Sequence, residues 1–188
     1  MMGYSHMFYG VDLEQLREIP GSDDRTLYQK ISGGEDSLET DERDALKRII
    51  KGNCQHEEGT KHLYGYALKA ICEEIGEMVG EDVYAVRDHP YKSKLIANGA
   101  PIDIPYDGSD FPEIGYLEQS ELEAEYQLAT ETKPRAKKTF VGFLLRRLSG
   151  GAIGREMDAE DVAEDMEAYA ATLKECMDKK LSLVSFRH

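Results

Sequence analysis

Apolar residues along most of the chain recur at intervals of three and four, which is the spacing of amphipathic helices. This pattern predicts one helix that begins after Asp12 and a second that runs to about Ile31. It also predicts a helix near 121–131 and another around Phe140 and Leu148. Three further helices are predicted from apolar positions at Ala45, Leu46, Ile49 and Ile50, at Leu63, Ala67, Ile71, Ile75 and Val79, and at Val162, Met166, Tyr169, Leu173 and Cys176. Most of the chain is therefore expected to be helical.

Two apolar runs, Gly3–Val11 and Leu181–His188, lack helical spacing and are predicted to be strands. Neither run alternates cleanly with polar residues, so we expect each strand to be buried on both faces and the two to pair at the centre of one sheet. The predicted fold is a single α+β domain over residues 1–188. It has a small sheet that includes both of these strands, surrounded by about six helices.

Capping residues predict where several helices begin and end. Asp12 is expected to cap the first helix, with Gln15 completing the capping box. The later predicted caps are Ser22 or Asp23, Thr40, Ser120 with Glu123, and Asp158, and Gly52–Asn53 is predicted to end a helix. Residues 80–98 are ambiguous, since Val83–Val86 and Lys94–Ala97 could each be a strand.

The stretch Gly99–Leu122 contains three of the six prolines, so it could be a linker or an ordered loop. A flexible linker is rich in Gly and Ser and poor in large apolar groups. This stretch instead contains many such groups, among them Ile102, Ile104, Tyr106, Phe111, Ile114, Tyr116 and Leu117. We therefore predict that it packs against the rest of the domain.

The net charge of −14 limits the classes of partner. Residues 1–94 have 12 basic and 19 acidic residues and 95–188 have 11 and 18, so each half contributes −7. An acidic surface repels phosphate backbones and anionic membranes and attracts basic proteins, although such a charge also serves solubility alone. We expect no nucleic-acid or membrane partner and consider a basic protein partner.

The cysteines and the beginning of the chain indicate a reduced, cytoplasmic protein. Cys54, Cys72 and Cys176 are odd in number and lack paired spacing, which argues against a secreted disulfide framework. The sequence begins without a basic region followed by an apolar run, so no signal peptide is predicted. No window has the roughly 18 apolar residues of a membrane span.

Two short motifs could support chemistry, but a simpler interpretation is favoured for each. Leu148–Gly154 (LSGGAIG) looks like the signature loop of transporter-type ATPases, but the phosphate-binding loop that it needs is missing, so a helix end is the better interpretation. Cys54–His62 combines a thiol, two imidazoles and two carboxylates, but its spacing is not an established zinc pattern. We predict no metal and no cofactor, and catalytic residues stay unassigned.

Tyrosine is unusually abundant, with 11 residues against 5 Phe and no Trp. Tyr rings with polar tips suit the lip of a pocket, although they also suit the margin of a core. Arg87, His89 and Tyr91 lie close together in one predicted turn, which could bind an anion or could be an exposed turn paired with acids. The candidate ligand-binding residues are these three and Tyr116.

The segment GAPIDIPYDGSDFPEIGYL resembles the G-x-P-x-x-I/L-P and DFP-x-I-GYL pattern of an uncharacterised bacterial family of about 200 residues. The stretches VDLEQLREIPGSDD, YGYALKAICEEIG and LVSFRH agree in the same order, so the resemblance covers nearly the whole chain. The family resembled has no established activity, so it implies no catalytic residues.

These observations favour a non-catalytic cytosolic binding protein, of an accessory or immunity type, that meets a basic partner through its acidic surface. The alternative is a small-molecule-binding protein or enzyme with a pocket lined by Tyr, His and Arg. In that case Arg87, His89 and Tyr116 should converge on one concave site.

Overall fold

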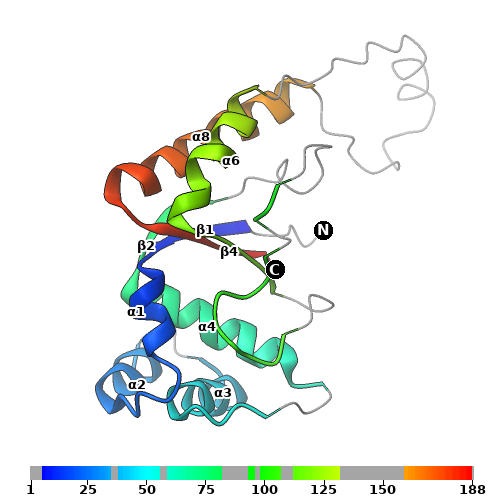
Figure 1. Ribbon diagram of the computed structural model, residues 1–188. Coiled ribbons are helices and arrows are strands. Elements are labelled where there is room, and N and C mark those ends of the chain that lie inside the picture. Colours follow the sequence, from blue (N-terminus) through cyan, green and yellow to red (C-terminus); the bar gives the residue numbers. More distant parts are fainter. Residues whose placement is uncertain are drawn as a thin grey trace, which may run out of the picture.

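The computed structural model of the protein describes residues 6–34, 38–55, 59–81, 93–95, 98–106, 112–131 and 159–187. These residues form six helices and four strands (Figure 1), which confirms the predicted α+β fold with a small sheet and about six helices. The strands are β1 (His6–Val11), β2 (Glu77–Glu81), β3 (Glu113–Leu117) and β4 (Ser182–Arg187). The helices are α1 (Leu13–Glu18), α2 (Arg25–Ser32), α3 (Thr40–Lys51), α4 (Lys61–Ile75), α6 (Gln119–Glu131) and α8 (Ala159–Lys179).

The four strands form one antiparallel sheet in the order β2-β1-β4-β3. The first and last strands are the two central ones, and Tyr9 pairs with Val184 near the middle of their ladder. Nearly every residue of both strands is buried. The predicted central pairing of these strands, and their burial on both faces, are therefore confirmed.

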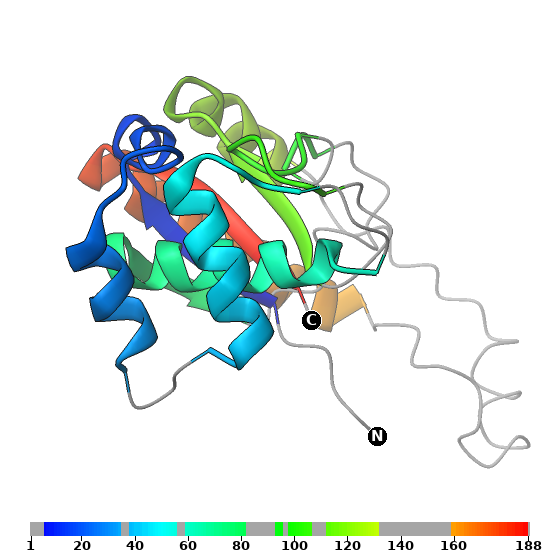
Figure 2. The same cartoon turned by 90° about the horizontal axis from the view of Figure 1, so that it is seen from below.

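Helices cover both faces of the sheet. Figure 1 shows α6 and α8 together on one face and α1, α2, α3 and α4 on the other, and Figure 2 shows α2, α3 and α4 in front of the sheet when it is seen from below. We call these two groups the α6/α8 layer and the α1–α4 layer. Each layer closes its own apolar core against the sheet.

Adjacent residues of β1 supply the two cores, because successive side chains of a strand point to opposite faces. Phe8 faces the α6/α8 layer, where its ring centroid lies 5.9 Å from that of Tyr169. Tyr9 faces the α1–α4 layer, and its hydroxyl donates a hydrogen bond of 2.8 Å to Glu73 in α4. The sheet thus separates two cores that share its backbone.

The helix start was predicted correctly at α1, whereas the starts of α2, α3 and α6 differ from the predicted ones. Asp12 caps α1 through hydrogen bonds from the amides of Glu14 and Gln15. The cap of α2 is Asp24, not Ser22 or Asp23, because Asp23 adopts a left-handed φ of 53° and belongs to the preceding turn.

The caps of α3 and α6 also precede the predicted residues. Helix α3 begins at Thr40 itself, so Glu39 is its cap, and the Glu42 carboxylate accepts from the Glu39 amide at 2.9 Å. Helix α6 begins at Gln119, and the Glu121 carboxylate accepts from the Glu118 amide at 3.1 Å. Both helices use glutamate where Thr40 and the Ser120–Glu123 pair were expected, since a carboxylate three residues into a helix reaches the capping amide equally well.

The helical pattern predicted through Val79 ends earlier, at Ile75. Gly76 follows, and a Cβ at this position would lie 2.6 Å from the carbonyl oxygen of Gly10. The chain passes so close to β1 that only glycine fits, and it turns there into β2, which contains Val79. The burial of Val79 was predicted correctly, but its element was wrong.

The described part of Gly99–Leu122 packs against the domain, as predicted. Its buried aliphatic side chains are those of Ile102, Ile104, Ile114, Leu117 and Leu122. The Tyr106 hydroxyl accepts a 2.7 Å hydrogen bond from the amide of Ile114, so the loop also protects the outer edge of β3. Lys94 and Leu95 are described and lie in no strand.

Several predictions concern residues that the structure does not describe. They are Phe111, the strand at Val83–Val86, the helix around Phe140 and Leu148, the LSGGAIG motif and the cap at Asp158. Among the helices over the described ranges, none is long and apolar enough to cross a membrane.

Candidate functional site

Of the four predicted ligand-binding residues, only Tyr116 lies in a described part of the chain. Its ring is half-buried in β3, with the guanidinium carbon of Arg17 6.0 Å from the ring centroid. Its amide donates to the carbonyl of Leu95 at 2.9 Å, and its carbonyl accepts from Asn98 at 3.0 Å. Tyr116 therefore has structural contacts on both its ring and its backbone. Whether Arg87, His89 and Tyr91 converge on it stays a prediction, because they lie outside the described residues.

Arg17 joins three segments beside Tyr116. Its guanidinium forms an ion pair with Glu118 and donates to the carbonyl of Pro101 at 3.4 Å. The hydrogen bond to Glu118 raises the pKa of Arg17. This arrangement ties α1 to the loop before β3 and to the start of α6, so we assign it a structural role.

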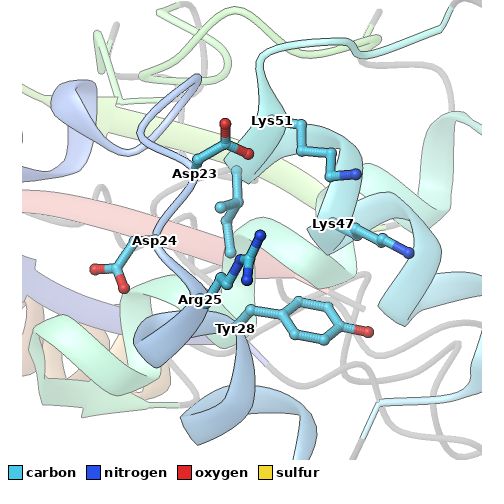
Figure 3. A pocket seen from close by; sticks show the side chains of 7 residues that line it. Asp23, Asp24, Arg25, Tyr28, Lys47 and Lys51 are labelled. Atoms are coloured by element: carbon cyan, nitrogen blue, oxygen red, sulfur yellow. The ribbon is translucent and has the colours of Figure 1, made fainter.

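An open groove of about 520 Å³ lies between α2 and α3, in the α1–α4 layer (Figure 3). It is lined by Asp23, Asp24, Arg25, Tyr28, Lys47, Ile50 and Lys51. Ile50 is buried and Tyr28 half-buried, whereas the charged residues are exposed. We call it the α2/α3 groove.

Backbone contacts fix the two walls of the groove relative to each other. The amides of Gly21 and Asp23 donate to the carbonyls of Ile49 and Ile50, at 3.3 and 3.0 Å, which holds the loop before α2 on the end of α3. Gly52 ends α3 with a left-handed φ of 65°, and a Cβ on it would lie 3.0 Å from the Cα of Gly21. The close approach of these two glycines brings the start of α2 alongside the last turns of α3.

The nitrogen-bearing ends of Arg25, Lys47 and Lys51 surround the open space of the groove together with the hydroxyl of Tyr28 (Figure 3). Over the described residues, none of these three cations forms an ion pair. Asp24 points away from this space, and its carboxylate is occupied by the amides of Thr26 and Leu27 at the start of α2.

The other acid of the lining, Asp23, lies beside Lys51 at the end of the groove away from Tyr28 (Figure 3). The part of the groove nearer Tyr28 is therefore the part where the donors of Arg25, Lys47 and the phenol lie away from Asp23. Such an arrangement can hold an anion, because ammonium, guanidinium and phenol groups all donate hydrogen bonds.

Sequence reasoning missed this groove. Lys47 and Lys51 are four residues apart, which places them on one face of α3, and that spacing was the available signal. Arg25 and Tyr28 come from another helix, and only the contact of the preceding loop with the end of α3 brings them across.

The two helical layers differ in net charge, although the two halves of the sequence have the same net charge. Helix α6 has four acids and no base, and α8 has seven acids and two lysines, so the two helices contribute −9 of the net −14. The four helices of the α1–α4 layer have seven acids and nine bases, a net +2. The α2/α3 groove thus belongs to the less acidic side of the molecule.

The three cysteine thiols are buried or half-buried, which disfavours their ionisation. Burial raises the pKa of the Cys54 and Cys72 thiols, and it raises that of Cys176 to about 12, so all three are protonated at neutral pH. No group of three or more His, Cys, Asp or Glu side chains suited to a metal ion occurs among the described residues. Three residues of the Cys54–His62 motif, 56–58, lie outside them.

Comparisons with known proteins confirm the resemblance to an uncharacterised family. Neither the search of curated proteins nor that of solved structures finds a match. One family, described as a domain of unknown function, matches residues 2–188, which includes every element of the fold above. The chain therefore belongs to the DUF7691 family.

Proposed function

We propose that this protein is a non-catalytic binding protein and that its binding site is the α2/α3 groove, which takes an anionic ligand. The observation that supports this proposal is the set of three cations, Arg25, Lys47 and Lys51, that surround one space without ion-pair partners among the described residues. These three side chains can donate charge-assisted hydrogen bonds to an anion and so hold it in the groove.

The rest of the described chain makes this set unusual. In a chain of net charge −14, cations readily find acids. Cations of the described residues with acidic partners include Arg17, Lys30, Lys69, Lys94, Lys174, Lys179 and Arg187. Three cations gathered without such partners are available to a ligand.

The test is a titration of the ¹⁵N-labelled protein with four anions: phenyl phosphate, inorganic phosphate, benzoate and citrate. We expect at least one anion to shift amide resonances of α2 and the end of α3. The shifts should be lost in the variant Arg25→Gln/Lys47→Gln/Lys51→Gln.

The matched control is Lys30→Gln, which removes a cation from the same helix but outside the groove lining. Lys30 pairs with Glu74 at an exposed position, so its loss costs little stability. If no anion shifts these resonances, or if the triple variant binds as well as the control, the groove is not an anion site.

The second candidate function is the predicted contact with a basic protein. It is favoured by the charge of the α6/α8 layer, whose exposed acids include Glu123, Glu164 and Glu167, none of them in an ion pair over the described residues. Such a surface accelerates association with a basic partner, more so at low salt.

This candidate is tested by affinity capture with three immobilised baits. The first bait is the parent protein, and the second is the triple variant Glu123→Gln/Glu164→Gln/Glu167→Gln. The third bait, Glu14→Gln/Glu18→Gln/Asp41→Asn, is a triple variant that removes three exposed acids from the α1–α4 layer. A basic protein that is captured by the first and third baits and lost by the second supports it. Equal capture by all three would exclude the α6/α8 layer as the contact. A pocket formed by Arg87, His89, Tyr91 and Tyr116 stays a prediction.

A further inference from the structure

We infer that the ligand of the α2/α3 groove is a small organic phosphate monoester. Its phosphate would lie between Arg25, Lys47 and Lys51, and its organic part would lie against Tyr28 and Ile50. This inference rests on the proposed anion site.

The number and placement of the cations favour phosphate over carboxylate. Two lysines on one face of α3, with Cβ atoms roughly 6 Å apart, face an arginine that comes from α2. One bidentate arginine is enough for a carboxylate. A phosphate monoester carries a charge of about −1.5 to −2 at pH 7 and three acceptor oxygens, so it can occupy donors on more than one side.

The apolar part of the lining favours an organic ester over the free ion. Ile50 is only 4% exposed, yet it reaches the lining, so it forms a floor between the charged walls. The Tyr28 ring packs partly on the core and turns its hydroxyl toward the lysines. A volume of about 520 Å³ is well above that of an inorganic ion and lies in the range of small-molecule sites.

The charge of the whole chain favours a small ligand over a polyanion. Nucleic acid would bring many phosphates to a protein of net charge −14, and only those within the groove would meet cations. A single phosphate group enters the groove without facing the acids of the α6/α8 layer on the opposite side of the sheet.

The test measures the dissociation constants of the same four anions by calorimetry at pH 7.5. Phenyl phosphate should bind at least about tenfold more tightly than benzoate, which has the same ring, and than inorganic phosphate, which has none. Each of Arg25→Gln, Lys47→Gln and Lys51→Gln should weaken phenyl phosphate by roughly three- to tenfold, whereas Lys30→Gln should change it less than about twofold.

The outcomes separate this inference from the proposed function. If benzoate or citrate binds the groove as tightly as phenyl phosphate, the anion site stands and the assignment of phosphate is wrong. If inorganic phosphate binds as tightly as phenyl phosphate, the assignment of an organic ester is wrong. If no anion binds in a manner that depends on Arg25, Lys47 and Lys51, both the inference and the proposed function are wrong.

Discussion

The two helical layers differ in how they use polar groups. The α6/α8 layer contributes −9 to the net charge and also buries a carboxylate, Glu125, which accepts hydrogen bonds from Tyr169 of α8 and from Ser93. The α1–α4 layer has a net charge of +2, the larger apolar core and the α2/α3 groove. The helices on opposite faces of one small sheet therefore differ strongly in net charge.

Each layer also places a tyrosine hydroxyl beside a glutamate near the sheet. In the α6/α8 layer the Tyr169 hydroxyl donates to Glu125 at 3.1 Å, and in the α1–α4 layer the Tyr9 hydroxyl donates to Glu73. Burial, and then the contact with Glu73, raises the pKa of Tyr9, so its hydroxyl keeps its proton and acts as a donor. The two cores thus fix their aromatic rings by the same device, although their surfaces differ.

The largest expected effects come from truncating one fully buried leucine in each layer. Leu68→Ala in α4 and Leu173→Ala in α8 should each lower the free energy of unfolding by about 2–5 kcal/mol, because each leaves a cavity in its core. If residues 1–188 form the predicted single domain, each substitution should accelerate amide hydrogen exchange in both layers. Faster exchange confined to the substituted layer would mean that the two layers unfold separately.

A glycine substitution should test a contact made only within the α1–α4 layer. Gly52→Ala should cost about 2 kcal/mol, because alanine disfavours the left-handed φ of 65° and its Cβ would press on Gly21. Gly59→Ala is the matched control, since Gly59 has a similar φ of 83° but nothing within 4 Å of its Cβ position. Chemical denaturation measures both. Equal losses would show that the contact of Gly52 with Gly21 adds nothing.

A smaller, pH-dependent effect on stability is expected from Glu121 in the first turn of α6. Burial alone would raise the pKa of Glu121, but the Glu118 amide, Lys94 and Asn98 together lower it. Glu121→Gln should cost about 1 kcal/mol at pH 7 through weaker capping of α6. Because the folded pKa is the lower one, this stability is complete above the unfolded pKa of about 4.3 and is lost as pH falls through the folded value.

The measurement is the difference in unfolding free energy between the parent protein and Glu121→Gln at pH 7 and at pH 3. The difference should shrink at pH 3, because the carboxyl is largely protonated in the unfolded chain there and part of the stability that its charge contributes is lost. A difference that stays constant between the two pH values would show that the charge of Glu121 contributes nothing to the cap.

The smallest effect on stability is expected from the acidic surface itself. Replacing Glu123, Glu164 and Glu167 by Gln should change the unfolding free energy by less than about 0.5 kcal/mol, in the stabilising direction, because exposed like charges repel weakly. The gain should vanish in 1 M salt. Destabilisation by these substitutions would mean that the acids support the fold, and the contrast between the layers would then lose its functional meaning.

The fold was largely predictable because its strongest signals are local. Apolar periodicity located the buried faces of α3, α4 and α8, and the two apolar runs without that periodicity located β1 and β4. The end of α4 was not predictable from periodicity, since Val79 continues the pattern. It is set by the close approach of Gly76 to β1, a contact between distant parts of the sequence.

The candidate site was much harder to predict than the fold. The clustering of Arg, His and Tyr in the sequence favoured Arg87 and its neighbours as ligand-binding residues. The groove instead combines ordinary surface residues of two helices. Arg25 and Lys47 are 22 positions apart in the sequence, and nothing local indicates that they meet. Their proximity depends on two backbone hydrogen bonds from the loop at Gly21 and Asp23.

The pairing of β1 with β4 has a consequence for how the chain acquires its fold during synthesis. His6 pairs with Arg187, so nearly the full length of the described chain separates the two central strands. While a ribosome makes the intervening helices, β1 has only the edge strand β2 available, and one side of its backbone waits for a partner. Closing so large a loop is slow, so the exposed nascent strand is the point at which molecular chaperones should bind most strongly.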